Sequence, residues 1–218
     1  MIVFEDVSLK KGGKLIIDNM STVIDDSDKV LIFARNGSGK SSLIKCIAGL
    51  EQVERGGIKY CKSGKEVIRG EMVISYLPEF YEFDKNISVK NLYNGFYLAN
   101  KVNGSLTDKS FIDKIFEALM IKKLENQHFN TLSKGEKKRL LMAITMMVKY
   151  DCLILDEPYD GLDSEWRKTI SELLKSSLNQ MGAPATIIIS SHIYNEKTDL
   201  ICNKVMTIEN KKVEVKAS

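Results

Sequence analysis

A chain of 218 residues, 44% of them hydrophobic and 28% charged, is long enough to bury a substantial core and has the composition of an ordinary globular domain. The formal net charge of +3 is small, and lysine and arginine are spread along the chain, so nucleic acid is not an expected partner. No apolar run approaches the roughly 18 residues of a membrane span. The four cysteines lack the C-x-x-C spacing of zinc or redox pairs, which predicts reduced thiols in a cytoplasmic protein.

The first third of the chain predicts strands around a single helix. Gly12 and Gly13 separate two β-rich runs and indicate a hairpin. Residues 29–33 are apolar on both sides, as expected for a buried parallel strand. Apolar runs predict strands at 2–9, 14–24, 29–33, 56–60 and 71–77, and helical spacing predicts a helix at 41–50 that ends at Gly49.

The predicted secondary structure changes twice along the rest of the chain. From about residue 86 helical periodicity dominates, and further on strands and helices alternate again. Helices are predicted at 87–100, 108–121, 134–150 (strongly amphipathic) and 164–180 (with Ser164 as cap), strands at 152–158 and 185–192, and a hairpin at 204–216 that turns near Asn210. The pattern predicts an α/β fold with a mainly parallel sheet, to which an antiparallel N-terminal β subdomain and a helical insertion are added.

A loop of small and polar residues follows the apolar run 29–33 directly. It begins at Ala34 and ends at Lys40, where the predicted helix starts. Gly37 and Gly39 permit unusual backbone angles, so successive N–H groups can surround phosphate oxygens beside a helix N-terminus. The spacing fits G-x-x-x-x-G-K-[ST], with alanine in place of the first glycine. The alternative, an ordinary Gly/Ser turn with a solvated lysine, leaves the strand before the loop and the helix after it unexplained.

Two residues of this loop have specific expected roles. Lys40 can reach the β- and γ-phosphates and is expected to be solvated in the free protein, and the Ser41 hydroxyl can ligate Mg²⁺. The candidate nucleotide-binding residues of the loop are Ala34, Arg35, Asn36, Gly37, Ser38, Gly39, Lys40, Ser41 and Ser42.

Two acids, Asp156 and Glu157, stand at the end of the strand CLIL. Ligands of open α/β sheets bind at such carboxyl ends. Asp156 can hold Mg²⁺ through water, and Glu157 can orient and polarise an attacking water. The alternative is a pair of solvated acids before a turn. That alternative does not explain why both acids directly follow a strand of four apolar residues.

The segment TLSKGEKKRL, residues 131–140, precedes this strand by about twenty residues. Ser133 can cap the following helix, and its hydroxyl and the free N–H groups behind it can form an anion site. By itself this is an ordinary helix start, and only its position before LILDEP favours a functional interpretation.

These segments together resemble the ATP-binding cassette (ABC) ATPase family along essentially the whole chain. The order of motifs fits: ARNGSGKSS as Walker A, YLPE near the Q-loop position, LSKGE as the signature, LILDEP as Walker B, GLD as the D-loop and SSH as the switch. The resemblance implies a single ABC ATPase domain, 1–218, with a P-loop NTPase core. Residues 1–85 and 150–218 would form that core with the β subdomain, and about 86–149 a helical subdomain carrying the signature.

The resemblance also implies a head-to-tail dimer around two ATP molecules with Mg²⁺. His192 would contact the γ-phosphate or the attacking water, as a second catalytic residue beside Glu157. Asp163 would link the two nucleotide sites, and Glu79 would join Ser41 and Asp156 as a metal ligand. The residues expected to contact the ATP of the other subunit are Ser133, Lys134, Gly135 and Glu136.

Three segments depart from the family pattern. Glu79 replaces a frequent glutamine, although a carboxylate can still bind Mg²⁺ or water. The signature reads LSKGE, and LSKG together with YLPE resembles export-type cassettes. Lys11 stands where the family often places an aromatic that stacks on adenine, and Phe4 is a possible substitute.

The resemblance therefore implies an ATP-hydrolysing motor subunit at the inner face of the cell membrane. Its partners would be a separate membrane-spanning subunit and a second nucleotide-binding subunit, identical or different. Without ATP the chain is expected to be largely monomeric. One alternative is a soluble ABC ATPase that acts on nucleic acid or ribosomes, which usually has a second cassette, a long coiled-coil insertion or a basic linker. Another is a small-molecule kinase, which would not need LSKGE.

Overall fold

The computed structural model describes residues 1–84, 86–181, 184–192 and 201–217. They form two compact units. The first unit comprises the described residues of Met1–Tyr76, Tyr150–Glu157 and Pro184–Ser218, and the second those of Leu77–Lys149 and Pro158–Ala183. The second unit therefore includes a stretch after residue 150 that the sequence had grouped with the core.

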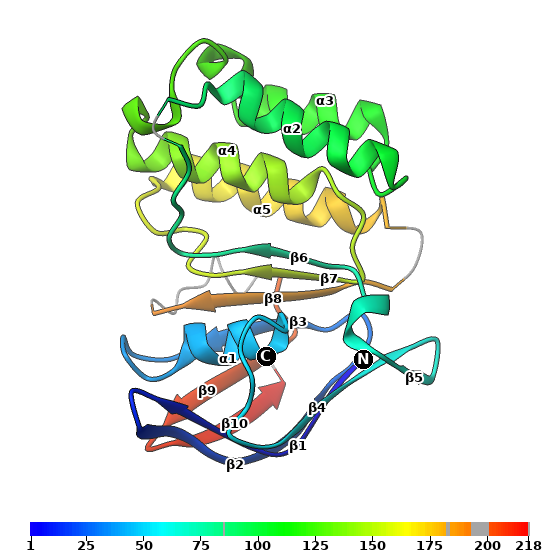
Figure 1. Cartoon of the computed structure of the whole chain (residues 1–218), viewed down its shortest axis with the longest axis vertical. Coiled ribbons are helices and arrows are strands. Elements are labelled where there is room, and N and C mark those ends of the chain that lie inside the picture. The colour runs from blue at the N-terminus through cyan, green and yellow to red at the C-terminus, as the bar shows by residue number, and fades with distance from the viewer. Residues whose placement is uncertain (85, 182–183, 193–200, 218) are drawn as a thin grey trace. The chain divides into compact units, whose positions relative to one another are not determined.

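The first unit contains two sheets. An antiparallel sheet has the order β2-β1-β4-β5 and comprises β1 (Ile2–Lys11), β2 (Lys14–Ile24), β4 (Arg55–Lys62) and β5 (Lys65–Val67). A second sheet has the order β10-β9-β3-β8-β7-β6 and comprises β3 (Lys29–Phe33), β6 (Ile74–Leu77), β7 (Cys152–Leu155), β8 (Thr186–Ser191), β9 (Lys204–Glu209) and β10 (Lys212–Ala217) (Figure 1). The two predicted hairpins, β1–β2 and β9–β10, are confirmed.

The centre of the second sheet is parallel. Strand β8 pairs with β3 on one side and β7 on the other, and Ile189 lies opposite both Leu31 and Leu155. Every residue of β7 and β8 is buried, which explains their continuous apolar sequences. The predicted α/β fold is confirmed. Because parallel strands end at one edge of a sheet, the residues after Phe33, Leu155 and Ser191 come together there.

One predicted strand is shorter than the sequence suggested. Residues 71–77 were expected to be extended throughout, but a short helical turn η1 (Arg69–Glu71) occupies the start, and β6 begins only at Ile74. The guanidinium of Arg69 holds this turn in place, because it donates to the carbonyl of Ala48 at 2.7 Å and to that of Met72 at 2.9 Å. Ala48 ends helix α1 (Lys40–Ile47), so Arg69 also satisfies a carbonyl that the helix leaves unpaired.

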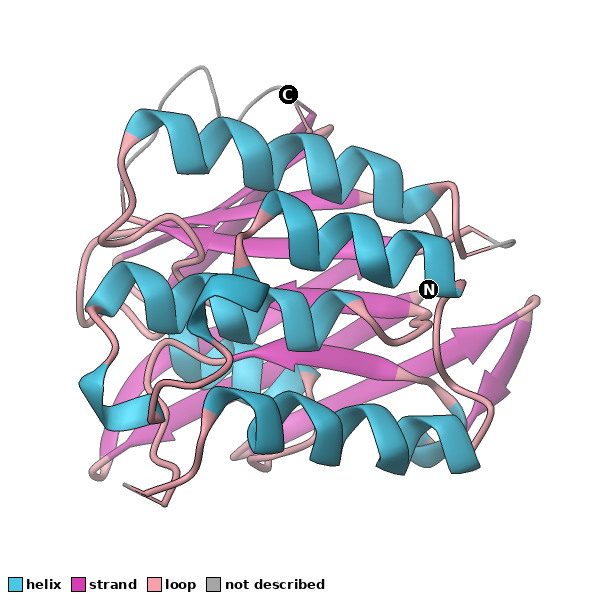
Figure 2. Ribbon diagram, turned by 90° about the horizontal axis from the view of Figure 1, so that it is seen from above, coloured by secondary structure: helices cyan, strands magenta, loops and turns pink. Residues whose placement is uncertain are grey.

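The second unit is helical. It contains α2 (Val89–Val102), α3 (Lys109–Ala118), the short turns η2 (Ile121–Leu124) and η3 (Phe129–Thr131), α4 (Lys134–Met146) and α5 (Ser164–Leu178). Helix α4 contacts α2 and α3, and α3 also contacts α5 (Figure 2). The sequence predicted α4 to be strongly amphipathic to residue 150. In the structure every residue from Leu140 to Met146 is buried, because neighbouring helices surround this half.

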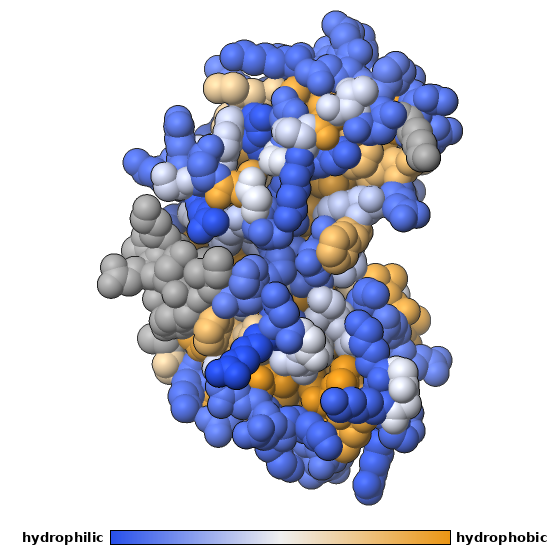
Figure 3. All heavy atoms as spheres, turned by 90° about the vertical axis from the view of Figure 1, so that its left-hand side faces the viewer, coloured by the Kyte–Doolittle hydropathy of each residue, from blue (hydrophilic) through white to orange (hydrophobic). Residues whose placement is uncertain are grey.

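The surface is largely polar. Among the residues that the structure describes, none of the helices combines the length and the apolar character that a bilayer crossing requires. The face in Figure 3 is mainly hydrophilic, and its hydrophobic residues form separate patches. The largest exposed fractions among the large apolar side chains belong to Val102, with 87%, and Phe80, with 82%.

Candidate functional site

The first unit places its loop at the carboxyl edge of the parallel sheet, between β3 and α1. Ala34 stays close to the neighbouring strand, since its N–H group donates to the carbonyl of Ser191 at 3.4 Å. Gly39 ends the loop with φ of 107°, and a Cβ at this position would lie 3.1 Å from Cδ1 of Ile16. Both the backbone angle and the close approach of Ile16 therefore require glycine here.

A pocket of about 620 Å³ lies beside the loop. Its wall consists of Phe33 to Ser38 and of Ile208, Glu209 and Asn210 from the β9–β10 hairpin. The Ser38 hydroxyl is buried and has no hydrogen-bond partner among the residues that the structure describes. A buried hydroxyl without a protein partner, in a loop with glycine backbone geometry, fits a loop that receives phosphate oxygens.

Lys40 differs from its expected state. The sequence predicted a solvated ammonium group, but Lys40 is 6% exposed. Its Nζ donates to the carbonyl of Ala34 at 2.7 Å and to that of Arg35 at 3.3 Å, and lies 3.5 Å from Oε1 of Glu157. The ammonium group is thus held inside its own loop, because carbonyls and a buried carboxylate replace water around it.

The two acids after β7 are held by the strand next to them. Asp156 and Glu157 are only 1% and 7% exposed. The Ser190 hydroxyl donates to Oδ1 of Asp156 at 2.5 Å and accepts the N–H of Glu157 at 2.8 Å. Oε2 of Glu157 lies 3.0 Å from Nδ1 of His192. The carboxylate of Glu157 is therefore fixed between a lysine and a histidine.

Ser190 is the residue of this group that the sequence interpretation missed. It lies inside the apolar run TIIISS and looked like part of a buried strand. The signal was its position two residues before His192, since alternate strand residues share one face. In the structure Ser190 is fully buried and contacts both acids.

We expect Ser190→Ala to lower both stability and catalysis. The change removes the hydroxyl that accepts the buried N–H group of Glu157 and donates to the Asp156 carboxylate. A buried donor without a partner costs about 1–3 kcal/mol, which chemical denaturation with urea measures. Ser191→Ala in the same strand is the matched control for hydroxyl loss. Unchanged stability and unchanged kcat would show that Ser190 does not support the acids.

In the second unit the residues Ser133 to Glu136 form the first turn of α4. The Ser133 Oγ accepts the N–H of Glu136 at 3.3 Å, and Oε2 of Glu136 accepts the N–H of Ser133 at 2.9 Å, a reciprocal capping box. The Ser133 hydroxyl also donates to Oε2 of Glu136 at 2.7 Å. The hydrogen bonds from the hydroxyl and N–H of Ser133 hold the pKa of the Glu136 carboxyl below its usual value. The predicted cap at Ser133 is confirmed.

Lys134 and Asp163 also have defined partners. Nζ of Lys134 lies 2.7 Å from Oδ2 of Asp160, and this hydrogen bond raises the pKa of the lysine. Asp163 caps α5, because its Oδ1 accepts the N–H groups of Glu165 and Trp166 at 3.1 and 3.0 Å. The predicted cap, Ser164, is wrong: it is the first residue of the helix, and the longer side chain before it reaches the free N–H groups.

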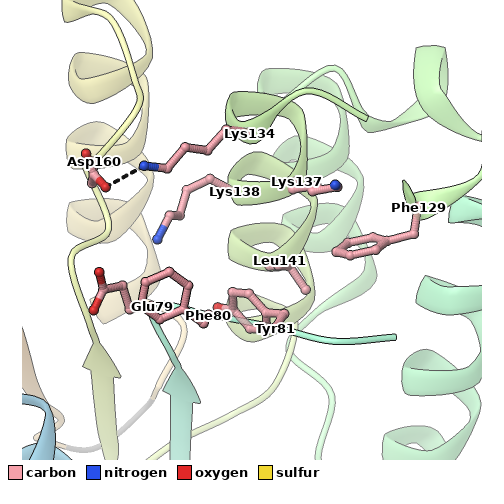
Figure 4. A pocket seen from close by; sticks show the side chains of 9 residues that line it. All are labelled: Glu79, Phe80, Tyr81, Phe129, Lys134, Lys137, Lys138, Leu141 and Asp160. Atoms are coloured by element: carbon pink, nitrogen blue, oxygen red, sulfur yellow. Dashed lines mark hydrogen bonds and ion pairs between the residues drawn. The ribbon is translucent and has the colours of Figure 1, made fainter. Parts of the chain in front are cut away.

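Glu79 lines a pocket of about 350 Å³ in the second unit (Figure 4). The wall contains three aromatic side chains, three lysines, a leucine and two acids: Phe80, Tyr81, Phe129, Lys134, Lys137, Lys138, Leu141, Glu79 and Asp160. In Figure 4 the ammonium groups of Lys134 and Lys138 point toward the side of the two acids, and Lys137 points toward Phe129. Nζ of Lys137 lies 5.4 Å from the centre of the Phe129 ring.

The structure thus gathers the candidate residues in two groups. Residues 34–42, Asp156, Glu157 and His192 come together in the first unit, and residues 133–136 lie near Asp160 in the second. Oxygen donors from Ser41 and Asp156 fit Mg²⁺, which takes most of its remaining ligands from phosphate and water. Phe4 does not fit its expected role as a base-stacking aromatic, because it is 2% exposed and packed in the hydrophobic core.

Comparisons with known proteins agree with this geometry. The family model described as ABC transporter matches residues 17–160. The chain is 29% identical to the uncharacterized ABC transporter ATP-binding protein YmeB of Lactococcus lactis, covering 98% of this chain and 85% of that protein. It is 29% identical to the methionine import ATP-binding protein MetN of Clostridium tetani, over 98% and 68% of the two chains.

Structural comparison gives the same fold. A solved ATP-binding subunit of an ABC transporter superposes with a TM-score of 0.80 at 20% identity, over 100% of this chain and 90% of that one.

Further sequence relatives are named for zinc import and for sulfate or thiosulfate import, and another for Nod factor export. The chain belongs to the ABC transporter family, whose ATP-binding members are ATPases that power transport.

Proposed function

We propose that this chain is the ATP-hydrolysing subunit of an ABC transporter and that it works with a separate membrane-spanning partner. The observation that carries the proposal is the position of Glu157. Its carboxylate is buried at the carboxyl edge of the parallel sheet, 3.5 Å from Nζ of Lys40 and 3.0 Å from Nδ1 of His192. A fixed carboxylate beside a phosphate-binding loop is suited to orient a water for attack on a phosphate.

The residues of the first unit have separate roles around the triphosphate. Lys40 exchanges the carbonyls of Ala34 and Arg35 for phosphate oxygens, and the backbone of residues 36–42 donates to the phosphates. His192 holds Glu157 in place and meets the γ-phosphate side of the site. Ser41 and Asp156 would hold Mg²⁺, which neutralises charge on the phosphates when bound. The third expected ligand, Glu79, belongs to the second unit.

The second unit receives the nucleotide of another subunit. Ser133, Lys134, Gly135 and Glu136 would face an ATP held by the loop of a second cassette, and Asp163 would connect the two sites. The first turn of α4 supports this role, since the N-terminus of a helix attracts anions. The second cassette is either another copy of this chain or a different one.

The predicted division of the chain, a core at 1–85 and 150–218 and a helical part at about 86–149, remains a proposal about domains. We place the chain at the inner face of the cell membrane.

The pocket with Phe80, Tyr81 and Phe129 is the surface that we assign to the membrane-spanning partner, because Phe80 is 82% exposed there. The export direction rests on LSKG and YLPE alone, and the relatives named for import do not support it.

The test is the distribution of the chain between membrane and soluble fractions of its native cells. We expect the unaltered chain in the membrane fraction and Phe80→Asp largely in the soluble fraction. Val102→Asp is the matched control, because Val102 is 87% exposed in the same unit and does not line the pocket. Recovery of the unaltered chain with ribosomes instead of membranes would favour the alternative, a soluble ABC ATPase.

Base selectivity is expected to be weak. Lys11 is exposed at the end of β1 and has no flat face for a purine, and Phe4 is buried. We expect Lys11→Tyr to tighten ATP binding several-fold, from a stacking gain of roughly 1 kcal/mol. Calorimetry with MgATP and MgGTP measures this, in a Glu157→Gln background that prevents turnover. A parent preference for ATP above about a hundredfold would show that another residue reads the base.

A further inference from the structure

The first turn of α4 and the segment 160–163 are packed against each other at several points within the second unit. Nζ of Lys134 lies 2.7 Å from Oδ2 of Asp160, which Figure 4 shows as a dashed line. A Cβ on Gly135 would lie 3.5 Å from the carbonyl oxygen of Gly161. The two segments therefore pass close to each other at Gly135 and Gly161, and the ion pair joins them beside this point.

Gly161 makes this approach possible. Its φ is 76°, and a Cβ there would lie 3.0 Å from Cδ of Lys134. The aliphatic part of the lysine therefore lies on the glycine while its ammonium group reaches the acid beside it. In the unaltered chain the contact thus combines the side chain of Lys134, the glycine at 161 and the carboxylate of Asp160.

A second contact joins the two elements further along. The guanidinium of Arg139 in α4 lies 4.0 Å from the centre of the Trp166 ring in α5, and it also donates to the carbonyl of Leu119 at 3.1 Å. Asp163 fixes the beginning of α5 by accepting the N–H groups of Glu165 and Trp166. Helix α4 is consequently joined to residues on both sides of Gly161, to Asp160 before it and to Trp166 after it.

We propose that Lys134 and Asp160 are positioning residues that lock the turn 133–136 to the segment 160–163, so that the two move as one body. The consequence for activity rests on the proposed function, in which Ser133 faces the nucleotide of the second cassette and Asp163 connects the two nucleotide sites. The lock then sets the spacing of these two groups. Lys134 lies in the turn that the proposed function turns toward the nucleotide, but its ammonium group is paired with Asp160, so in this proposal it acts through Asp160 and not by binding the nucleotide.

The lock is tested first on the monomeric chain by amide hydrogen exchange. The reporters are the N–H groups of Glu136, which donates to Ser133 Oγ, and Leu162, which donates to the Tyr159 carbonyl. We expect Asp160→Asn to speed exchange at both amides by about two- to fivefold, the range for an exposed ion pair. The double reversal, Lys134→Asp with Asp160→Lys, should restore slow exchange at both.

The matched control is Glu5→Gln, which breaks the Lys59–Glu5 pair. That pair has a distance of 2.8 Å and exposed fractions of 43% and 51%, and it lies in the first unit. The control should leave both reporter amides unchanged. A change at Leu162 alone, or no rescue by the double reversal, would overturn the lock.

The second test is ATP-dependent self-association in the Glu157→Gln background, followed by sedimentation. A symmetric dimer contains the lock twice, so Asp160→Asn should raise the Kd of the dimer by about 4- to 25-fold. The double reversal should restore the original Kd. Loss of association that the reversal does not restore would mean that Lys134 binds phosphate directly, against the proposal. If the Glu157→Gln variant itself does not self-associate in the presence of ATP, the proposed dimer is contradicted. The hydrogen-exchange experiment on the monomeric chain still tests the lock in that case.

Discussion

Glu157→Gln is expected to bind MgATP but to hydrolyse it about 10²–10³ times more slowly than the unaltered chain. The amide has almost the shape of the carboxylate but cannot act as a base or polarise water to the same degree. Because Glu157 is buried beside Lys40 and His192, the loss falls on the chemical step and not on nucleotide binding. Single-turnover kinetics with separately measured ATP affinity tests this.

The same variant should accumulate as a nucleotide-bound dimer, because ATP persists between the subunits when it is not hydrolysed. Glu51→Gln is a suitable control, since Glu51 pairs with Lys45 at the exposed far end of α1. Normal turnover in Glu157→Gln would remove this residue from the catalytic role. An ATP-independent dimer of high affinity in the unaltered chain would contradict the expected monomer.

Lys40→Met should weaken ATP binding roughly 10- to 100-fold, because a charged hydrogen bond to a phosphate contributes about 1.5–3 kcal/mol. The structure adds an effect that the sequence did not suggest. Lys40 is buried and donates to two loop carbonyls beside the Glu157 carboxylate, so its loss removes a buried hydrogen-bond donor and the positive charge next to that carboxylate. We expect the free energy of unfolding to fall by about 1–3 kcal/mol.

Lys45→Met is the matched control for this prediction. Lys45 lies in the same helix, but it is 43% exposed and pairs with Glu51 at the helix end. Calorimetry gives the ATP affinity of both variants, and urea denaturation gives their stability. Unchanged ATP affinity in Lys40→Met would contradict the phosphate-binding interpretation of the loop, and unchanged stability would mean that water replaces the ammonium group without cost.

Local patterns in the sequence were sufficient for the fold class and for the loop. A strand of four or five apolar residues, a glycine-rich turn and a helix start are determined by neighbours along the chain, which is why β3 was predicted with its bounds and α1 and β7 with their starts, although α1 ends at Ile47 and β7 at Leu155. The residue types themselves also indicated the chemistry at Lys40, Asp156 and Glu157.

Only the tertiary structure decided how these groups are arranged. Ser190 contacts Asp156 because β7 and β8 are parallel neighbours in a particular register, and register depends on strand pairing across distant parts of the chain. The burial of Lys40 and Phe4 likewise depends on what packs over them. The cap of α5 and the Lys134–Asp160 pair depend on where side chains point in space. Sequence thus determined which chemical groups the protein carries, and the packing of distant segments determined their partners and their exposure to water.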